Sequence, residues 1–77
     1  LDEIVIFPNP TNNHLWVQSK NALIVNIRIR DNQGRLLRED IGNATSQQIN
    51  ISSFPHGLYF IQISTTKGEK TLKFIKE

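Results

Sequence analysis

Short stretches in which apolar and polar residues alternate run along the whole chain. This period-two pattern is typical of β-strands that bury one face. In residues 22–31, the clearest case, the pattern predicts a buried face and a solvated face. The buried face would hold Leu23, Val25, Ile27 and Ile29, and the solvated face Ile24, Asn26, Arg28 and Arg30. No stretch has a helical period, so the chain is predicted to be all-β.

Seven extended segments, separated by turn residues, follow from this pattern. They cover residues 3–7, 14–20, 22–31, 35–41, 47–51, 58–64 and 70–76. The pattern places Leu15 and Val17, Ile49 and Ile51, and Tyr59, Ile61 and Ile63 on buried faces. We expect residues 42–46 to be a loop, residues 54–57 a corner and residues 65–68 a hairpin turn. About seven short strands with frequent turns predict an antiparallel, immunoglobulin-like β-sandwich.

The size of the chain limits it to one domain, residues 1–77. It has no cysteine, so burial of apolar side chains must stabilise the fold. It also has no methionine, and we therefore expect it to be an excerpt of a larger secreted protein. The longest apolar run is residues 22–25, far shorter than a membrane-spanning helix.

A search for catalytic chemistry finds no set of residues that would carry it. His14 and His56 are far apart and match no metal-binding spacing, and no nucleophile elbow or phosphate-binding loop occurs. The basic residues form two groups, Arg28, Arg30, Arg35 and Arg38, then Lys67, Lys70, Lys73 and Lys76. With a net charge of only +2 we expect solvated surfaces and no nucleic-acid partner. The prediction is a non-enzyme without metal or cofactor.

Two aromatic residues have two interpretations each. Trp16 and Tyr59 would pack in or near the core, or together form a stacking platform for a carbohydrate. The Tyr59 hydroxyl group is expected to bind a backbone group, as the corner tyrosines of sandwich domains do.

Two motifs have a physical role that the residues themselves indicate. Pro8 and Pro10 fix φ and remove two backbone donors, which ends the first strand, and Asn9 is expected to cap the turn. Gly57 is expected where φ is positive or where a side chain would clash.

The order of three features resembles a known family. Phe7-Pro8-Asn9-Pro10-Thr11 follows the first strand, Gly57-Leu58-Tyr59-Phe60-Ile61 follows the corner, and Gly68 precedes a last strand that ends Lys73-Phe74-Ile75-Lys76. Together they resemble the C-terminal sorting domain of the type IX secretion system of Bacteroidetes, over nearly the whole chain. The chain has Asn12-Asn13-His14 where the family often has a glycine, and Phe54 where it usually has leucine.

The resemblance implies a function without chemistry. Such a domain ends a cargo protein and directs it from the periplasm across the outer membrane, through contacts with the translocon. A sortase-like peptidase then removes the domain, and the cargo is attached to the cell surface or released. The resemblance implies that much of the signal lies between Gly57 and Lys76. The residues expected to carry the signal are Pro8, Asn9, Pro10, Gly57, Tyr59, Gly68, Lys73, Phe74, Ile75 and Lys76.

Alternative functions remain open from the sequence. In one alternative, the domain is a small carbohydrate- or protein-binding module of a cell-surface enzyme. In another, it is a spacer that stabilises a preceding domain. Exposed edge strands would also allow two copies to form a homodimer. The sequence identifies neither the cargo nor the cleavage site.

Overall fold

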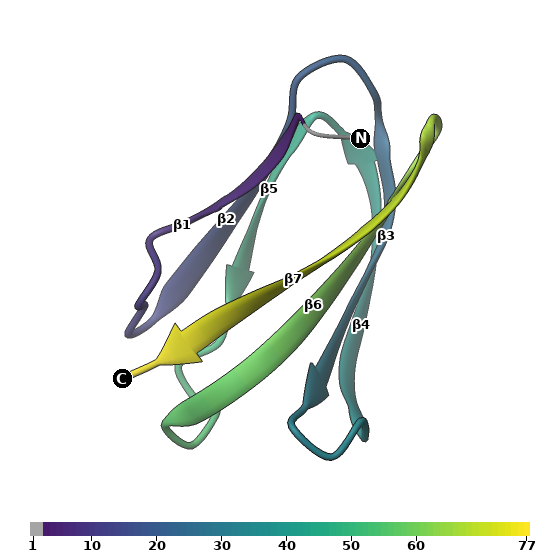
Figure 1. Cartoon of the computed structure of the whole chain (residues 1–77). Coiled ribbons are helices and arrows are strands. Elements are labelled where there is room, and N and C mark those ends of the chain that lie inside the picture. The colour runs from purple at the N-terminus through teal and green to yellow at the C-terminus, as the bar shows by residue number, and fades with distance from the viewer. Residues whose placement is uncertain (1–2) are drawn as a thin grey trace.

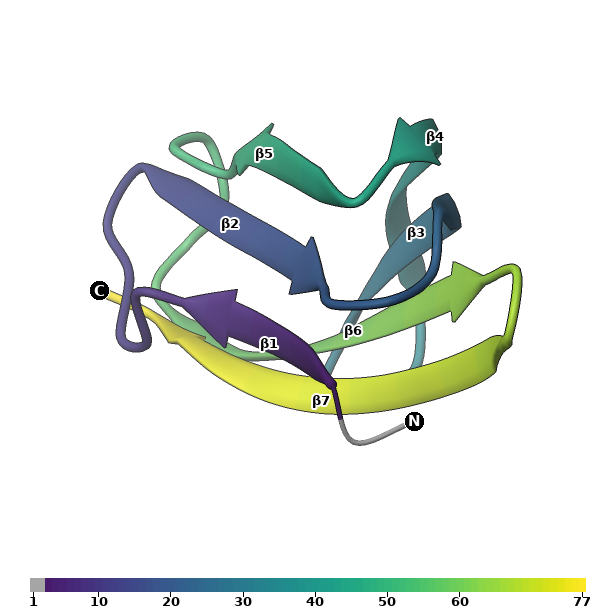
Figure 2. The same ribbon diagram turned by 90° about the horizontal axis from the view of Figure 1, so that it is seen from above.

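Residues 3–77 are described by the computed structural model, which consists of seven strands in two antiparallel sheets (Figure 1). The strands are β1 (Ile4–Phe7), β2 (His14–Ser19), β3 (Ile24–Asp31), β4 (Leu36–Ala44), β5 (Ser46–Asn50), β6 (Gly57–Thr65) and β7 (Gly68–Lys76). One sheet has the strand order β1-β2-β5, and the other β4-β3-β6-β7. Figure 2 shows the three-stranded sheet lying across the four-stranded one. The predicted all-β sandwich is confirmed.

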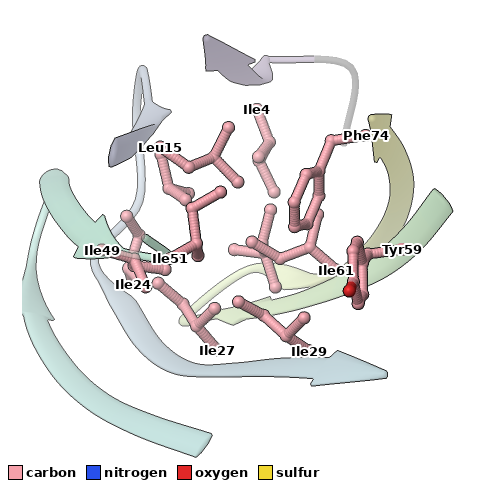
Figure 3. Close-up of a cluster of buried hydrophobic side chains, with 12 residues drawn as sticks. Ile4, Leu15, Ile24, Ile27, Ile29, Ile49, Ile51, Tyr59, Ile61 and Phe74 are labelled. Atoms are coloured by element: carbon pink, nitrogen blue, oxygen red, sulfur yellow. The ribbon is translucent and has the colours of Figure 1, made fainter. Parts of the chain in front are cut away.

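The core lies between the two sheets and is built mainly from isoleucine (Figure 3). Strands β2 and β5 contribute Leu15, Val17 and Ile49, and β6 contributes Tyr59, Ile61 and Ile63, as the alternation predicted. Ile51, just after β5, is also buried as predicted. Full burial of one aliphatic side chain stabilises a fold by about 1.5–3 kcal/mol, so this layer is the main source of stability.

Strand β3 departs from the predicted alternation in its first half. Ile24 is completely buried, although the pattern put it on the solvated face. Leu23 and Val25 are exposed, although the pattern put them in the core. The register of β3 against both β4 and β6 shifts between Ile24 and Asn26. A β-bulge with one extra residue explains the difference, because it reverses the side-chain alternation for the residues before it.

Residues 42–46 are not the loop that their polar composition predicted. Gly42, Asn43 and Ala44 continue β4, and Ser46 begins β5, with only Thr45 between the strands. The chain crosses from one sheet to the other at this point, because β4 pairs with β3 and β5 with β2. A Cβ atom on Gly42 would clash with the side chain of Gln47 and lie 3.0 Å from the carbonyl oxygen of Ile24. Glycine therefore allows the close approach that the crossing requires.

Strand β7 forms one edge of the four-stranded sheet and carries the end of the chain. It is joined to β6 by the predicted hairpin turn and pairs with β6 without interruption, from Gly68 opposite Thr65 to Lys76 opposite Gly57. Figure 2 shows β7 along the side of the sandwich below β1. None of the described residues lies in a helix that is long and apolar enough to cross a membrane.

Candidate functional site

The last third of β7 is held on both of its edges. One edge pairs with β6, and the other exchanges hydrogen bonds with the loop between β1 and β2. The Asn9 side-chain amide donates to the carbonyl oxygen of Lys73 at 3.1 Å. Its Oδ1 atom accepts from the backbone N–H of Ile75 at 3.0 Å. The sequence predicted that Asn9 would cap its own turn, but its amide instead acts as a peptide group would in a neighbouring strand.

Thr11 extends this contact by backbone hydrogen bonds. Its N–H donates to the carbonyl oxygen of Ile75 at 2.9 Å, and its carbonyl oxygen accepts from the N–H of Glu77 at 2.8 Å. The side chain is buried, and its hydroxyl group donates to the carbonyl oxygen of His14. Sequence reasoning assigned no role to Thr11, although it lies within the motif quoted for the family. We call Asn9 and Thr11 the β7 clasp.

The two prolines beside Asn9 are exposed. The peptide bonds before Pro8 and Pro10 are both cis. The prolines lie just after β1, at the point where the sequence predicted that the strand would end.

The four motif residues at the end of β7 point to two different sides. Lys73 and Ile75 are exposed on the outer face of the sheet, whereas Phe74 and Lys76 face inward and are buried. The Phe74 ring stacks on Tyr59 with 5.5 Å between centroids. The Lys76 ammonium group donates to the carbonyl oxygen of Glu77 at 3.1 Å. The structure therefore makes Lys73 and Ile75 available for contact, and makes Phe74 and Lys76 part of the packing.

Tyr59 lies in the core, as the sequence predicted. Its hydroxyl group donates to the carbonyl oxygen of Pro55 at 2.5 Å, which is the predicted bond to a backbone group. Its ring also packs against Phe54, with 5.2 Å between centroids. Gly57 starts β6 with φ of 154° and Gly68 starts β7 with φ of 138°, and L-residues rarely adopt such values. The predicted positive φ of Gly57 is confirmed, and no atom lies near enough to clash with a side chain there.

Five residues on the outer face of β3, β6 and β7 form a surface that we call the outer patch. They are Arg30, Leu58, Phe60, Lys73 and Ile75. Arg30 lies opposite Phe60 and Phe60 opposite Lys73, so these three form a row across three strands. Leu58 lies opposite Ile75 in the next row of the same face. The sequence placed Arg30, Leu58 and Phe60 on the face away from the core but gave them no role, because only strand pairing brings them beside Lys73.

The predicted stacking platform of Trp16 with Tyr59 does not exist. Trp16 is 37% exposed on the outer face of the three-stranded sheet, where it pairs with Phe7. Tyr59 is buried in the other sheet. A hollow in the described part of the chain lies near the Val5 and Gln18 ends of β1 and β2, and neither aromatic residue lines it.

Several arginines on the surface form solvated ion pairs, with Asp31, Glu39 and Asp40. The N–H groups of Arg35 and Gln33 bind the Asp31 carboxylate and lower its pKa. The Asn26 amide and the Arg28 guanidinium bind Glu39 and lower the pKa of its carboxyl group. Within residues 3–77, no group of histidine and acidic side chains is placed to hold a metal ion.

Comparisons with known proteins found a matching family model and a solved structure with a similar fold. The family model described as the secretion system C-terminal sorting domain matches residues 5–77. The crystal structure of a DUF3244-family protein with an immunoglobulin-like β-sandwich fold, from Bacteroides vulgatus, superposes with a TM-score of 0.79. The two chains are 25% identical, and the superposition covers 97% of this chain and 85% of that one. The search of curated proteins found no match.

Proposed function

Because the chain belongs to the family of secretion-system C-terminal sorting domains, we propose that it is the type IX sorting signal of a larger exported protein. It directs that protein across the outer membrane to the cell surface or the medium. Domains of this family and of the immunoglobulin-like fold are typically non-catalytic, so the function rests on recognition and needs no active site.

The proposal includes the steps around translocation. The cargo precedes residue 1 in the same chain and reaches the translocon from the periplasm. A sortase-like peptidase then separates the cargo from the domain, and the cargo is attached to the surface or released. These steps are the ones that the family resemblance implies, and residues 1–77 act in them as a single sorting domain.

The observation that carries the proposal is the presentation of Lys73 and Ile75. Both lie on the exposed face of β7, in the motif that ends the chain, and neither is needed to fill the core. The β7 clasp fixes the backbone on one side of these residues and β6 fixes it on the other. A rigid strand that presents fixed side chains can be recognised without the entropic cost of ordering a flexible tail.

A reporter fusion tests the proposal directly. Residues 1–77 would be placed behind a periplasm-targeted fluorescent protein in a bacterium with a working type IX system. We expect the reporter at the cell surface or in the medium, and in the periplasm of a translocon mutant. An intact, folded fusion that stays in the periplasm of both strains would contradict the sorting function and favour a binding module.

The two lysines of the terminal motif are expected to differ in that assay. Lys73→Ala should lower export of the reporter several-fold with little change in the melting temperature, because Lys73 is exposed. Lys76→Ala should lower the melting temperature by removing a packed side chain, since its stem is buried. Lys67→Ala, in the hairpin turn, is the matched control and should change neither. If Lys73→Ala and Lys67→Ala are exported equally well, Lys73 is not a recognition residue.

A further inference from the structure

The outer patch combines exposed apolar side chains with two cationic groups. Leu58 and Ile75 are 36% and 41% exposed, and Phe60 is half-buried between Arg30 and Lys73. We propose that the outer patch is the docking surface for a protein partner whose own surface places carboxylates among apolar side chains. The proposal rests on the sorting function and names the chemistry of the partner that reads the signal.

The geometry of the sheet sets the spacing that such a partner must match. Arg30 and Lys73 lie on β3 and β7 with β6 between them, so their backbones are two strand spacings, or about 10 Å, apart. Phe60 lies between Arg30 and Lys73 in this row, and Leu58 and Ile75 continue the apolar area toward the end of β7. A carboxylate above each cation would bring apolar side chains of the partner onto Phe60, Leu58 and Ile75.

The charges of the patch favour an acidic partner. Within residues 3–77, no salt bridge joins Arg30 or Lys73 to a carboxylate. The Arg30 guanidinium donates to the neutral Gln62 amide oxygen at 2.7 Å. Arg28, in the next row, is by contrast already bound to Glu39 at 2.8 Å. The charge of Arg30 also contributes to lowering the pKa of Glu39, but Arg30 forms no salt bridge with that carboxylate. Arg30 and Lys73 therefore retain the capacity to bind a carboxylate from outside, and their electrostatic attraction also speeds the encounter.

Two other occupants fit these charges less well. A second copy stacked face to face would place the same two cations over the same patch, and like charges repel. An anionic membrane would gain only about fivefold in affinity for each basic residue, and this patch has two. The patch is also a flat sheet, without the large amphipathic face that inserts into an interface.

A charge-reversal experiment tests the proposal in the export assay. Arg30→Glu with Lys73→Glu should lower export about tenfold or more, because the partner's carboxylates would then face carboxylates. The matched control is Lys20→Glu with Lys67→Glu, which changes the net charge equally on exposed loops outside the patch. The control should be exported like the unmodified domain, and Arg30→Lys with Lys73→Arg should keep most of the export. Circular dichroism and melting temperatures show that each variant is folded.

A second pair of variants tests the apolar half of the patch. Ile75→Ser should reduce export several-fold, whereas Val5→Ser should not. Val5 is 49% exposed on the other sheet, so both changes remove a similar exposed side chain. Together with the charge variants, this pair distinguishes a partner surface that has both apolar side chains and carboxylates from one that binds the domain through carboxylates alone. Normal export of Ile75→Ser would overturn the apolar part of the proposal.

The outcomes also separate this proposal from the sorting function. If the unmodified domain is exported and the patch variants are exported equally well, the docking surface is wrong and the sorting function stands. If the unmodified domain is not exported, both are wrong. The purified domain can also be tested for flotation with phosphatidylglycerol vesicles. If it floats with them and the charge reversal abolishes this binding, the patch binds a membrane. If the purified domain sediments as a dimer and the charge reversal makes it a monomer, the patch binds a second copy of the domain.

Discussion

Tyr59 connects the corner at residues 54–57 to the core through both parts of its side chain. The ring packs between Phe54 and Phe74, and the hydroxyl group binds the carbonyl oxygen of Pro55. One residue thus contributes apolar burial and satisfies a backbone acceptor that the corner leaves outside the sheets. The corner is therefore held at a fixed position relative to β6 and β7.

Replacement of Tyr59 by phenylalanine isolates the hydroxyl group. Tyr59→Phe should lower the free energy of unfolding by about 1–2 kcal/mol, because the carbonyl of Pro55 loses its donor. For a domain of this size, that corresponds to a fall of roughly 4–16 °C in melting temperature. Ser64→Ala, which removes an exposed hydroxyl group bound to Glu69, should cost less than about 0.5 kcal/mol. Equal losses in the two variants would contradict the structural role of the Tyr59 hydroxyl.

Acid should destabilise the domain through Asp31 and Glu39. Their ordinary pKa values are 3.8 and 4.5, and hydrogen bonds in the folded state lower both. A carboxyl group with a depressed folded-state pKa stabilises the fold above its unfolded pKa. That stability is lost as the pH falls through the folded pKa. Thermal melts should therefore show a lower melting temperature at pH 3 than at pH 7.

A substitution assigns part of this pH effect to one residue. Glu39→Gln should narrow the difference in melting temperature between pH 7 and pH 3, since it removes a titrating group. Glu69→Gln is the matched control, because no arginine within residues 3–77 forms a salt bridge with Glu69. The effect should be small, as both Asp31 and Glu39 are accessible to solvent. An unchanged pH dependence in Glu39→Gln would exclude this residue as a source.

The β7 strand shows how a local motif acts on a distant element. The β7 clasp comes from residues more than 60 positions before the residues to which it is hydrogen-bonded. It covers only the end of the outer edge of β7. The rest of that edge, toward Gly68, receives no hydrogen bond from a further strand within the described residues. The clasp therefore protects the part of the strand that carries the terminal motif.

Removal of the Asn9 amide should loosen this part of β7 selectively. Asn9→Ala removes two hydrogen bonds and should lower the free energy of unfolding by about 1–2 kcal/mol. Hydrogen exchange of the Ile75 amide should become faster, because β7 opens locally. The amide of Ile61 lies between two strands at the centre of the sheet, so its exchange should change only as much as the global free energy of unfolding requires. Asn13→Ala, in the same loop and without a side-chain hydrogen bond inside residues 3–77, should leave both unchanged. Equal acceleration at Ile75 and Ile61 would show that the clasp stabilises only the whole domain.

Strand β3 shows why alternation alone does not place every side chain. Ile27 and Ile29 lie in the core as predicted, but Ile24 replaces Leu23 and Val25 there. Each residue in 22–25 is apolar, so the sequence holds no local signal for where the bulge occurs. The pairing with β4 and β6 decides it, and the buried side chains of the other sheet select Ile24.

The arrangement of the two sheets determines what the molecule can present to a partner. The inner faces of both sheets are used for the core, so recognition is left to the outer faces, the edges and the loops. On the four-stranded sheet, the outer face brings together Arg30 from β3, Leu58 and Phe60 from β6, and Lys73 and Ile75 from β7. The outer patch is therefore a property of the whole sheet, although its last two members belong to the terminal motif.

The sequence by itself determined the all-β class, most strand positions, the buried faces of β2, β5 and β6 and the bond of the Tyr59 hydroxyl group to the backbone. It did so because each depends on alternation or turn chemistry within about ten residues. The order of its motifs also indicated the family. Only the tertiary structure decided the bulge in β3, the strand nature of residues 42–46, the binding of Asn9 to β7 and the composition of the outer patch. These features depend on pairing between strands that are distant along the chain, and a local pattern carries no information about which distant residues meet.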